Sequence, residues 1–176
     1  RSVPQQFGDQ VQLLALPRNI EKSAARNAGI RAARADYVCM LDSDDELTKH
    51  SVEDRLAVFQ RDPSFKGVAY GLTCPPDGGP DTRWANSSSP EGDVLLPYVR
   101  RPFLHNNGFL LSRQNMEQHG MYDVRLTNRE DKELLIRLAA RLEFRFCGAF
   151  VNRMHFSAGS ARMNYHKAAA QGLLML

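Results

Sequence analysis

The sequence predicts one domain with an α/β layered fold around a mixed, mainly parallel sheet. Segments of strand length alternate with segments of helical periodicity, which is typical of this class. The run at residues 37–41 (YVCML) is short and continuously apolar, as expected for a strand buried on both faces. With 176 residues and 43% hydrophobic content, the chain is long enough for one sizeable core.

The first half of the chain alternates regularly. Pro17 and Asn19 break the first apolar run, and Ser23 is a plausible N-cap for the alanine-rich stretch behind it. Asp62 and Pro63 end the second helical pattern. The expected elements are a strand at 10–16, a helix at 23–35, a strand at 37–41, a helix at 51–61 and a strand at 66–72.

The second half is less regular, so we expect mixed strand directions there. Residues 73–93 are rich in Pro, Gly, Ser and Asn, and loops of this length are usually functional or disordered. Gly120 is the expected C-cap of a short helix. The remaining elements are expected to be helices at 93–101, 113–119, 130–141 and 167–176, with strands at 108–112 and 144–151.

Composition excludes several classes of protein. No apolar run approaches the roughly 20 residues of a membrane helix, and the polar start is not a signal peptide. The 3 cysteines are far apart and odd in number, which indicates reduced thiols in the cytoplasm rather than a disulfide framework or a zinc site. The net charge of +3 is mild, although every acidic residue lies at or before Glu143. The basic tail is either a solvated surface or a phosphate-facing lobe.

A cluster of carboxylates follows the apolar strand directly, at Asp42, Asp44 and Asp45. Open α/β sheets bind ligands beyond the carboxyl ends of their strands. A divalent cation would relieve the mutual repulsion of these carboxylates, and Mg²⁺ and Mn²⁺ prefer oxygen ligands. The alternative is an acidic turn that only caps the next helix. An EF-hand is disfavoured, because no glycine lies at the sixth position counted from Asp42.

Five motifs in one order resemble those of family 2 glycosyltransferases, which have the GT-A fold. Each motif alone is weak, but five in sequence with sensible spacing are specific. The motifs are SAARNAGI at 23–30 with MLDSDD at 40–45, GFLLSR at 108–113, GMYDVRL at 120–126, REDKELL at 129–135 and RMH at 153–155. The resemblance implies a three-layer GT-A domain over residues 1–176 and the transfer of a sugar from a nucleotide-diphosphate donor.

The chain departs from the family pattern at its front. Family members begin with a strand–helix–strand unit that holds the nucleobase, and such a unit takes about 30 residues or more. No comparable segment precedes Gln10. The domain is therefore expected to be incomplete at its N-terminus, and this chain alone to be inactive.

The resemblance also assigns roles. Asp44 would hold Mn²⁺ or Mg²⁺ on the donor diphosphate, and Asp42 would contact the ribose or a metal-bound water. Asp131 would be the catalytic base of an inverting transfer, since it lies at a predicted helix start. The alternative for Asp131 is that it only favours the helix dipole. A helix N-terminus would lower its pKa and burial would raise it, and the sequence does not decide between them.

Further residues are assigned with alternatives left open. Arg26 would either bind the donor or lock its helix to the sheet. Arg153 would neutralise the diphosphate. His155 would do the same or complete the metal shell, although a lone histidine is more often structural. The expected acceptor contacts are Asn106, Asn107, Trp84 and Glu130.

Partners and competing functions follow from the same reading. A UDP-sugar is the favoured donor, with GDP- and dTDP-sugars as alternatives, and the acceptor is a glycan or a lipid-linked molecule, as in polysaccharide biosynthesis. No basic–aromatic RNA motif occurs, so no nucleic-acid partner is expected. The chain is expected in the cytoplasm, where it could also lie at the inner face of the membrane. The sequence is compatible with a peripheral membrane contact and with a homo-oligomer. A sugar nucleotidyltransferase and a non-catalytic partner surface are the competing readings.

Overall fold

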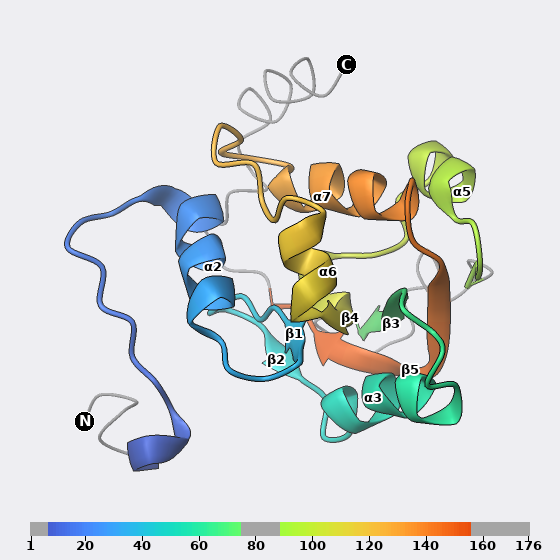
Figure 1. Ribbon diagram of the computed structural model, residues 1–176, viewed down its shortest axis with the longest axis horizontal. Helices are drawn as coiled ribbons and strands as arrows, with labels where there is room; N and C mark the ends of the chain where they lie inside the picture. The colour runs from blue at the N-terminus through green and yellow to red at the C-terminus, as the bar shows by residue number, and fades with distance from the viewer. Residues whose placement is uncertain (1–6, 75–88, 156–176) are drawn as a thin grey trace.

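The structure, a computed structural model, describes residues 7–74 and 89–155. These residues form a five-stranded sheet with helices on both of its faces (Figure 1). The strands are β1 (Tyr37–Cys39), β2 (Glu46–Leu47), β3 (Val68–Cys74), β4 (Phe109–Ser112) and β5 (Phe144–Arg153). The mixed α/β class predicted from the sequence is confirmed.

The strand directions correct one part of the prediction. The strand order is β1-β4-β3-β5-β2. Only β3 and β5 pair in parallel, whereas β1–β4, β3–β4 and β2–β5 are antiparallel. Within the described residues the sheet is thus mixed but not mainly parallel. The physical reason is that β4 lies between β1 and β3 and runs opposite to both.

The helices include those expected from periodicity, with small shifts at their ends. α3 spans Ser51–Arg61, as predicted. α2 begins earlier than predicted, at Glu21, whose amide donates a hydrogen bond to the Asn19 side chain at 2.9 Å. Ser23 is therefore inside α2, where its hydroxyl donates to the Leu126 carbonyl at 3.1 Å. The helices are α2 (Glu21–Ala32), α3, α5 (Leu95–Arg100), α6 (Arg113–Gln118) and α7 (Glu130–Ala139), with 3-10 turns η1 (Gly8–Gln10) and η2 (Asn106–Gly108).

Two apolar clusters lie on opposite faces of the sheet, as strand alternation requires. On β3 and β4, Ala69 and Leu110 point to one face and pack with Val58 and Phe59 of α3. Their neighbours point to the other face, where helices α2, α5, α6 and α7 cover the larger cluster (Figure 1). The buried residues of that cluster include Ile30, Val68, Tyr70, Tyr98, Phe109, Leu111, Met116, Leu134, Leu135 and Leu138. The domain therefore has three layers.

The expected strand at residues 10–16 is wrong. Residues 12–16 have no regular structure and run along the outside of the molecule (Figure 1). Leu13 is 68% exposed and Leu14 is 44% exposed. A strand forms only with a hydrogen-bonding neighbour, and no described strand lies beside this segment. The expected helix at 167–176 lies outside the described residues. No helix in the described ranges is both long and apolar enough to cross a membrane.

The topology gathers polar segments from distant parts of the sequence. The acidic turn (residues 42–45) follows β1 and leads into β2. Pairing of β2 with the end of β5 sets Glu46 opposite Arg153. η2, which precedes β4, and the beginning of α7 supply the remaining polar side chains.

Candidate functional site

The acidic turn is held by hydrogen bonds from η2. The Asp45 amide donates to the Asp42 carbonyl at 3.0 Å, which closes the turn. The Asp42 amide donates to the side-chain oxygen of Asn107 at 3.0 Å, and Asn107 Nδ2 donates to Asp45 Oδ2. Asn106 Nδ2 donates to Asp42 Oδ1 at 3.3 Å. Asn106 and Asn107 are buried, so they fix the carboxylates from beneath.

The three predicted aspartates differ in exposure. The Asp42 side chain is part-buried and accepts from Arg26. Asp45 accepts from the His155 amide at 2.9 Å. Asp44 is exposed at the tip of the turn. Asp44 is thus the carboxylate best presented to a ligand, whereas Asp42 and Asp45 have protein partners.

Arg26 connects the acidic turn to α7. Its guanidinium donates to Asp42 and to Glu130 Oε1, the second at 2.7 Å. Lys22, one turn earlier in α2, lies 2.8 Å from the same Glu130 oxygen. Burial alone lowers the pKa of Arg26, but attraction to Asp42, Tyr122 and Glu130 outweighs it and raises the pKa above its ordinary value. Arg26 therefore stays charged and spans both sides of the site.

The start of α7 places Asp131 in a partly buried position. Arg129 has a left-handed backbone (φ 59°) and directly precedes the helix, which begins with Glu130 buried at 2% exposure. Burial raises the pKa of Asp131 above its ordinary value, and the charge of Glu130 raises it further. The Lys132 amide and the charges of Lys132 and Lys22 only oppose this shift. Burial therefore outweighs the lowering expected at a helix N-terminus.

The end of β5 brings two more predicted residues beside the acidic turn. Arg153 is exposed and lies across from Glu46 in the β2–β5 pair. The His155 Nε2 atom is 3.5 Å from Glu46 Oε1 and is itself buried, although the His155 side chain as a whole is 42% exposed. A guanidinium and an imidazole therefore adjoin the acidic turn, and a guanidinium is well suited to pair with phosphate oxygens.

The donor set fits a divalent cation that takes only part of its ligands from the protein. Among the described residues, no group of three or more His, Cys, Asp or Glu side chains is arranged to hold a metal. Mg²⁺ sites of the phosphate-binding kind need no such cage, because one or two carboxylates act with waters and substrate phosphates. Asp44 presents an exposed carboxylate of this kind. The oxygen chemistry of the turn thus fits Mg²⁺ or Mn²⁺ only when substrate completes the shell.

Three of the four predicted acceptor residues, Asn106, Asn107 and Glu130, are buried next to the acidic turn. Asn106 and Asn107 are 4% and 3% exposed, and Glu130 is ion-paired beneath the site. Their hydrogen bonds and ion pairs hold the charged groups of the site, and an acceptor contact by these residues stays a prediction. Trp84 lies outside the described residues.

Sequence reasoning missed the supporting roles of Tyr122 and Lys22, whereas Asn27 was expected, like Arg26, to lock its helix to the sheet. Tyr122 donates its hydroxyl hydrogen bond to Asn106 Oδ1, and Asn27 fixes Tyr122 through two backbone contacts of 2.8 and 2.9 Å. Lys22 and Arg26 share one face of α2 at a spacing of four residues, which could have indicated a common acidic partner. Asn106 and Asn107 were predicted as acceptor contacts, but their place beneath the acidic turn had no comparable signal, since it depends on contacts with a distant segment.

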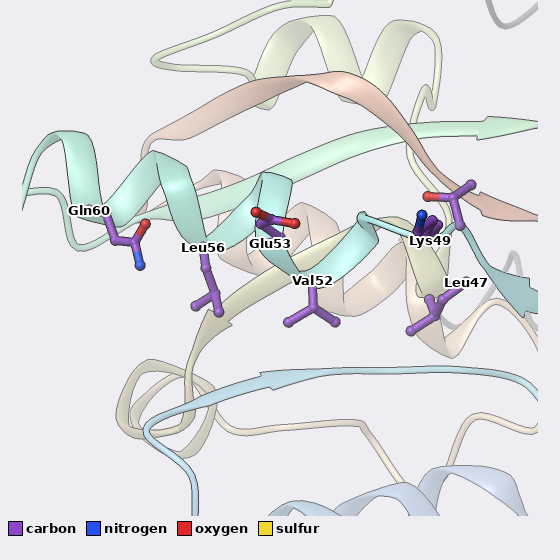
Figure 2. A pocket seen from close by; sticks show the side chains of 7 residues that line it. Leu47, Lys49, Val52, Glu53, Leu56 and Gln60 are labelled. Atoms are coloured by element: carbon purple, nitrogen blue, oxygen red, sulfur yellow. The ribbon is translucent and has the colours of Figure 1, made fainter.

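An open groove of ≈ 600 Å³ lies along α3, separate from the acidic turn. Figure 2 shows Leu47, Val52 and Leu56 pointing to the same side, with Lys49, Glu53 and Gln60 around them. The groove contains none of the turn's aspartates, so we place the functional site at the turn, where the charged groups converge.

Fold and site together define a class of protein. A mixed α/β domain with a carboxylate-rich turn at a strand end, flanked by cationic side chains, is suited to a phosphate-bearing ligand. The chain matches the sequence profile described as Glycosyl transferase family 2 over residues 2–121. The chain therefore belongs to glycosyl transferase family 2.

Individual relatives agree with this family. The amylovoran biosynthesis glycosyltransferase AmsB of Erwinia amylovora is 37% identical over 54 residues, which is 31% of this chain and 18% of AmsB. The crystal structure of S. aureus TarS 1-349 in complex with UDP-GlcNAc has a TM-score of 0.71 at 14% identity, over 97% of this chain and 52% of TarS 1-349. Its UDP complex has a TM-score of 0.60 at 16% identity, over 90% of this chain and 47% of that one. The chain thus spans about half or less of the relatives that it matches.

Proposed function

We propose that this chain carries the donor site and the catalytic base of an enzyme that transfers a sugar from a nucleotide-diphosphate donor to a hydroxyl acceptor. One observation carries the proposal. Arg26 donates to Asp42 on the donor side and to Glu130, the residue directly before Asp131. The acidic turn and the proposed base therefore belong to one connected arrangement.

The donor half of the site is the exposed edge of the acidic turn. Asp44, with His155 as a second candidate, would hold Mn²⁺ or Mg²⁺ against the donor diphosphate. The bound ion would supply neutralisation of the charge that grows on the departing nucleoside diphosphate. Arg153 is exposed beside the turn, so its guanidinium can pair with the same phosphates. Arg26 holds Asp42 in place through its hydrogen bond to the Asp42 carboxylate.

Asp131 is the proposed base. Its carboxylate would accept the proton of the acceptor hydroxyl as that oxygen attacks the anomeric carbon and the diphosphate departs from the opposite face. This single displacement inverts the configuration at that carbon. A carboxylate with a raised pKa is a stronger base than an ordinary aspartate, and burial raises the pKa of Asp131.

The comparisons support one donor class. S. aureus TarS was crystallised with UDP-GlcNAc and with UDP, so we propose a UDP-sugar as donor. AmsB is named for biosynthesis of amylovoran, which favours a glycan acceptor over other hydroxyl compounds. A lipid-linked acceptor and a cytoplasmic site of action stay predictions.

The test replaces Asp131 with asparagine in the full-length protein and measures UDP release from UDP-GlcNAc with Mn²⁺. Asp131→Asn keeps the shape of the side chain but removes the base, so turnover should fall by about 10²–10⁴-fold. Glu133→Gln is the matched control, because Glu133 lies in the same helix and pairs with Arg137. Glu133→Gln should retain nearly all turnover. Unchanged turnover in Asp131→Asn would show that Asp131 is not the base.

A further inference from the structure

Arg55 of α3 is a fully buried cation that forms no ion pair within residues 7–74 and 89–155. Its side chain is 0% exposed, and no carboxylate among the described residues forms an ion pair with it. Burial lowers the pKa of Arg55, and the nearby Cys39 and Cys147 oppose that shift only in part. An arginine nevertheless stays protonated at neutral pH. A charge in such a place is tolerated only when its donors are satisfied.

The Arg55 guanidinium donates hydrogen bonds to two segments of the chain, one at Ser51 and one at residues 107–109. Nε donates to the Ser51 carbonyl at 2.9 Å, and Nη2 donates to the Ser51 hydroxyl at 2.7 Å. Nη1 donates to the Phe109 carbonyl at 2.8 Å and, over 3.4 Å, to the Asn107 carbonyl. The rigid guanidinium therefore joins the first turn of α3 to the junction of η2 and β4.

That junction carries the two asparagines beneath the acidic turn. Asn107 accepts from the Asp42 amide at 3.0 Å and donates to Asp45, so its side chain contacts both ends of the turn. The backbone of Asn107 must be fixed for this side chain to reach both partners. Arg55 fixes it from the opposite face of the sheet, where α3 lies.

We propose that Arg55 is a positioning residue for the acidic turn, acting through Asn107 to set the orientation of Asp42 and Asp45. It makes no contact with substrate. The link to catalysis rests on the proposed function of the turn as the donor site. The structural part concerns only hydrogen bonds within the chain, so it can be tested without any ligand.

Hydrogen exchange by NMR tests the structural part in ligand-free protein. Arg55→Lys keeps the positive charge but loses the planar fork that reaches both segments. The Asp42 amide and the Asn107 side-chain amide should then exchange about 10-fold faster, as expected for loss of a charge-assisted hydrogen bond. The amides of Leu134 and Leu135, which are buried in α7 and pack in the apolar cluster that does not include α3, should change far less. Arg61→Lys is the matched control, since Arg61 is exposed in the same helix, and it should change neither.

Two other variants keep the test decisive. If Arg55→Lys does not fold, Ser51→Ala removes one anchor of the guanidinium and should produce a smaller change at the same two amides. Combining Arg55→Lys with Asn107→Ala should weaken metal-dependent UDP binding no more than Asn107→Ala alone, because both act through one path.

The outcomes are distinct. An unchanged exchange rate at the Asp42 amide, or an equal rise at Asp42 and at the α7 amides of Leu134 and Leu135, would overturn the positioning role. Additive effects on UDP binding would also overturn it. Wild-type protein that binds no UDP would instead contradict the proposed function, and the exchange data would still decide the role of Arg55.

Discussion

At the scale of single residues, ionisation of the Asp131 carboxylate is predicted to lower the free energy of unfolding. The pKa of Asp131 is raised above 3.8 in the folded chain, so the folded state binds more protons than the unfolded state between 3.8 and the raised value. The free energy of unfolding should fall as pH rises through this window. Asp131→Asn removes this contribution, so the stability of the variant should improve relative to wild type as pH rises. Urea unfolding at a series of pH values measures the difference.

Ionisation of Asp123 is predicted to change the free energy of unfolding in the opposite direction to that of Asp131. Hydrogen bonds from Arg125 lower the pKa of Asp123 to about 2, so its stabilising contribution is present above 3.8 and is lost as pH falls toward 2. Asp123→Asn should therefore lose stability relative to wild type at neutral pH, and the loss should shrink in acid. The same slope for both variants would contradict the assignment for Asp131.

The candidate residues could be predicted from the sequence to different degrees. Asp42 and Asp44 follow an apolar strand directly, so their place at a strand end is encoded locally. Arg26 and Asp131 were found through ordered motifs. The burial of Asn106, Asn107 and Arg55 depends on contacts more than 50 residues apart in the chain, which periodicity does not reveal.

At the scale of elements, the pairing of β3 with β5 depends on close approach at Gly71. A Cβ atom there would lie 2.3 Å from Val151 Cγ1 and 2.8 Å from the Ala149 carbonyl oxygen. Gly71→Ala should lower the free energy of unfolding by about 1–3 kcal/mol, because the strands must move apart. Thermal or urea unfolding measures the loss.

Gly29 is the matched control for Gly71. It is exposed within α2, and a Cβ atom there would meet no atom within 4 Å. Gly29→Ala should raise the free energy of unfolding by about 0.5–1 kcal/mol, because alanine loses less backbone entropy in a helix. If both substitutions changed stability in the same direction, the close packing assigned to Gly71 would be wrong.

Helices were predicted more accurately than strands for a physical reason. Apolar residues recur at helical spacing along α3, so its limits at Ser51 and Arg61 can be predicted from local periodicity. A strand needs a neighbour as well as a pattern. Residues 10–16 have the pattern of a strand but no described neighbour, and they are not one.

At the scale of the whole molecule, alternation of strands and helices predicted a layered α/β fold and the family resemblance implied three layers, but the expectation of a mainly parallel sheet was wrong. β4 follows α5 and inserts between β1 and β3, antiparallel to both. The sequence order of the strands does not encode this insertion. The consequence for the site is direct, because the insertion carries η2 beneath the acidic turn.

The central claim is that the acidic turn binds a nucleoside diphosphate together with a divalent cation. Calorimetric titration of UDP into the protein, first with Mn²⁺ and then with EDTA, tests it most directly. Asp44→Asn is the decisive variant, because Asp44 is the exposed carboxylate of the turn. We predict that UDP binds with Mn²⁺, that EDTA abolishes the binding, and that Asp44→Asn weakens it at least about 10-fold, as for loss of one charged contact. Equal binding of UDP by wild type and Asp44→Asn, with or without Mn²⁺, would contradict the account.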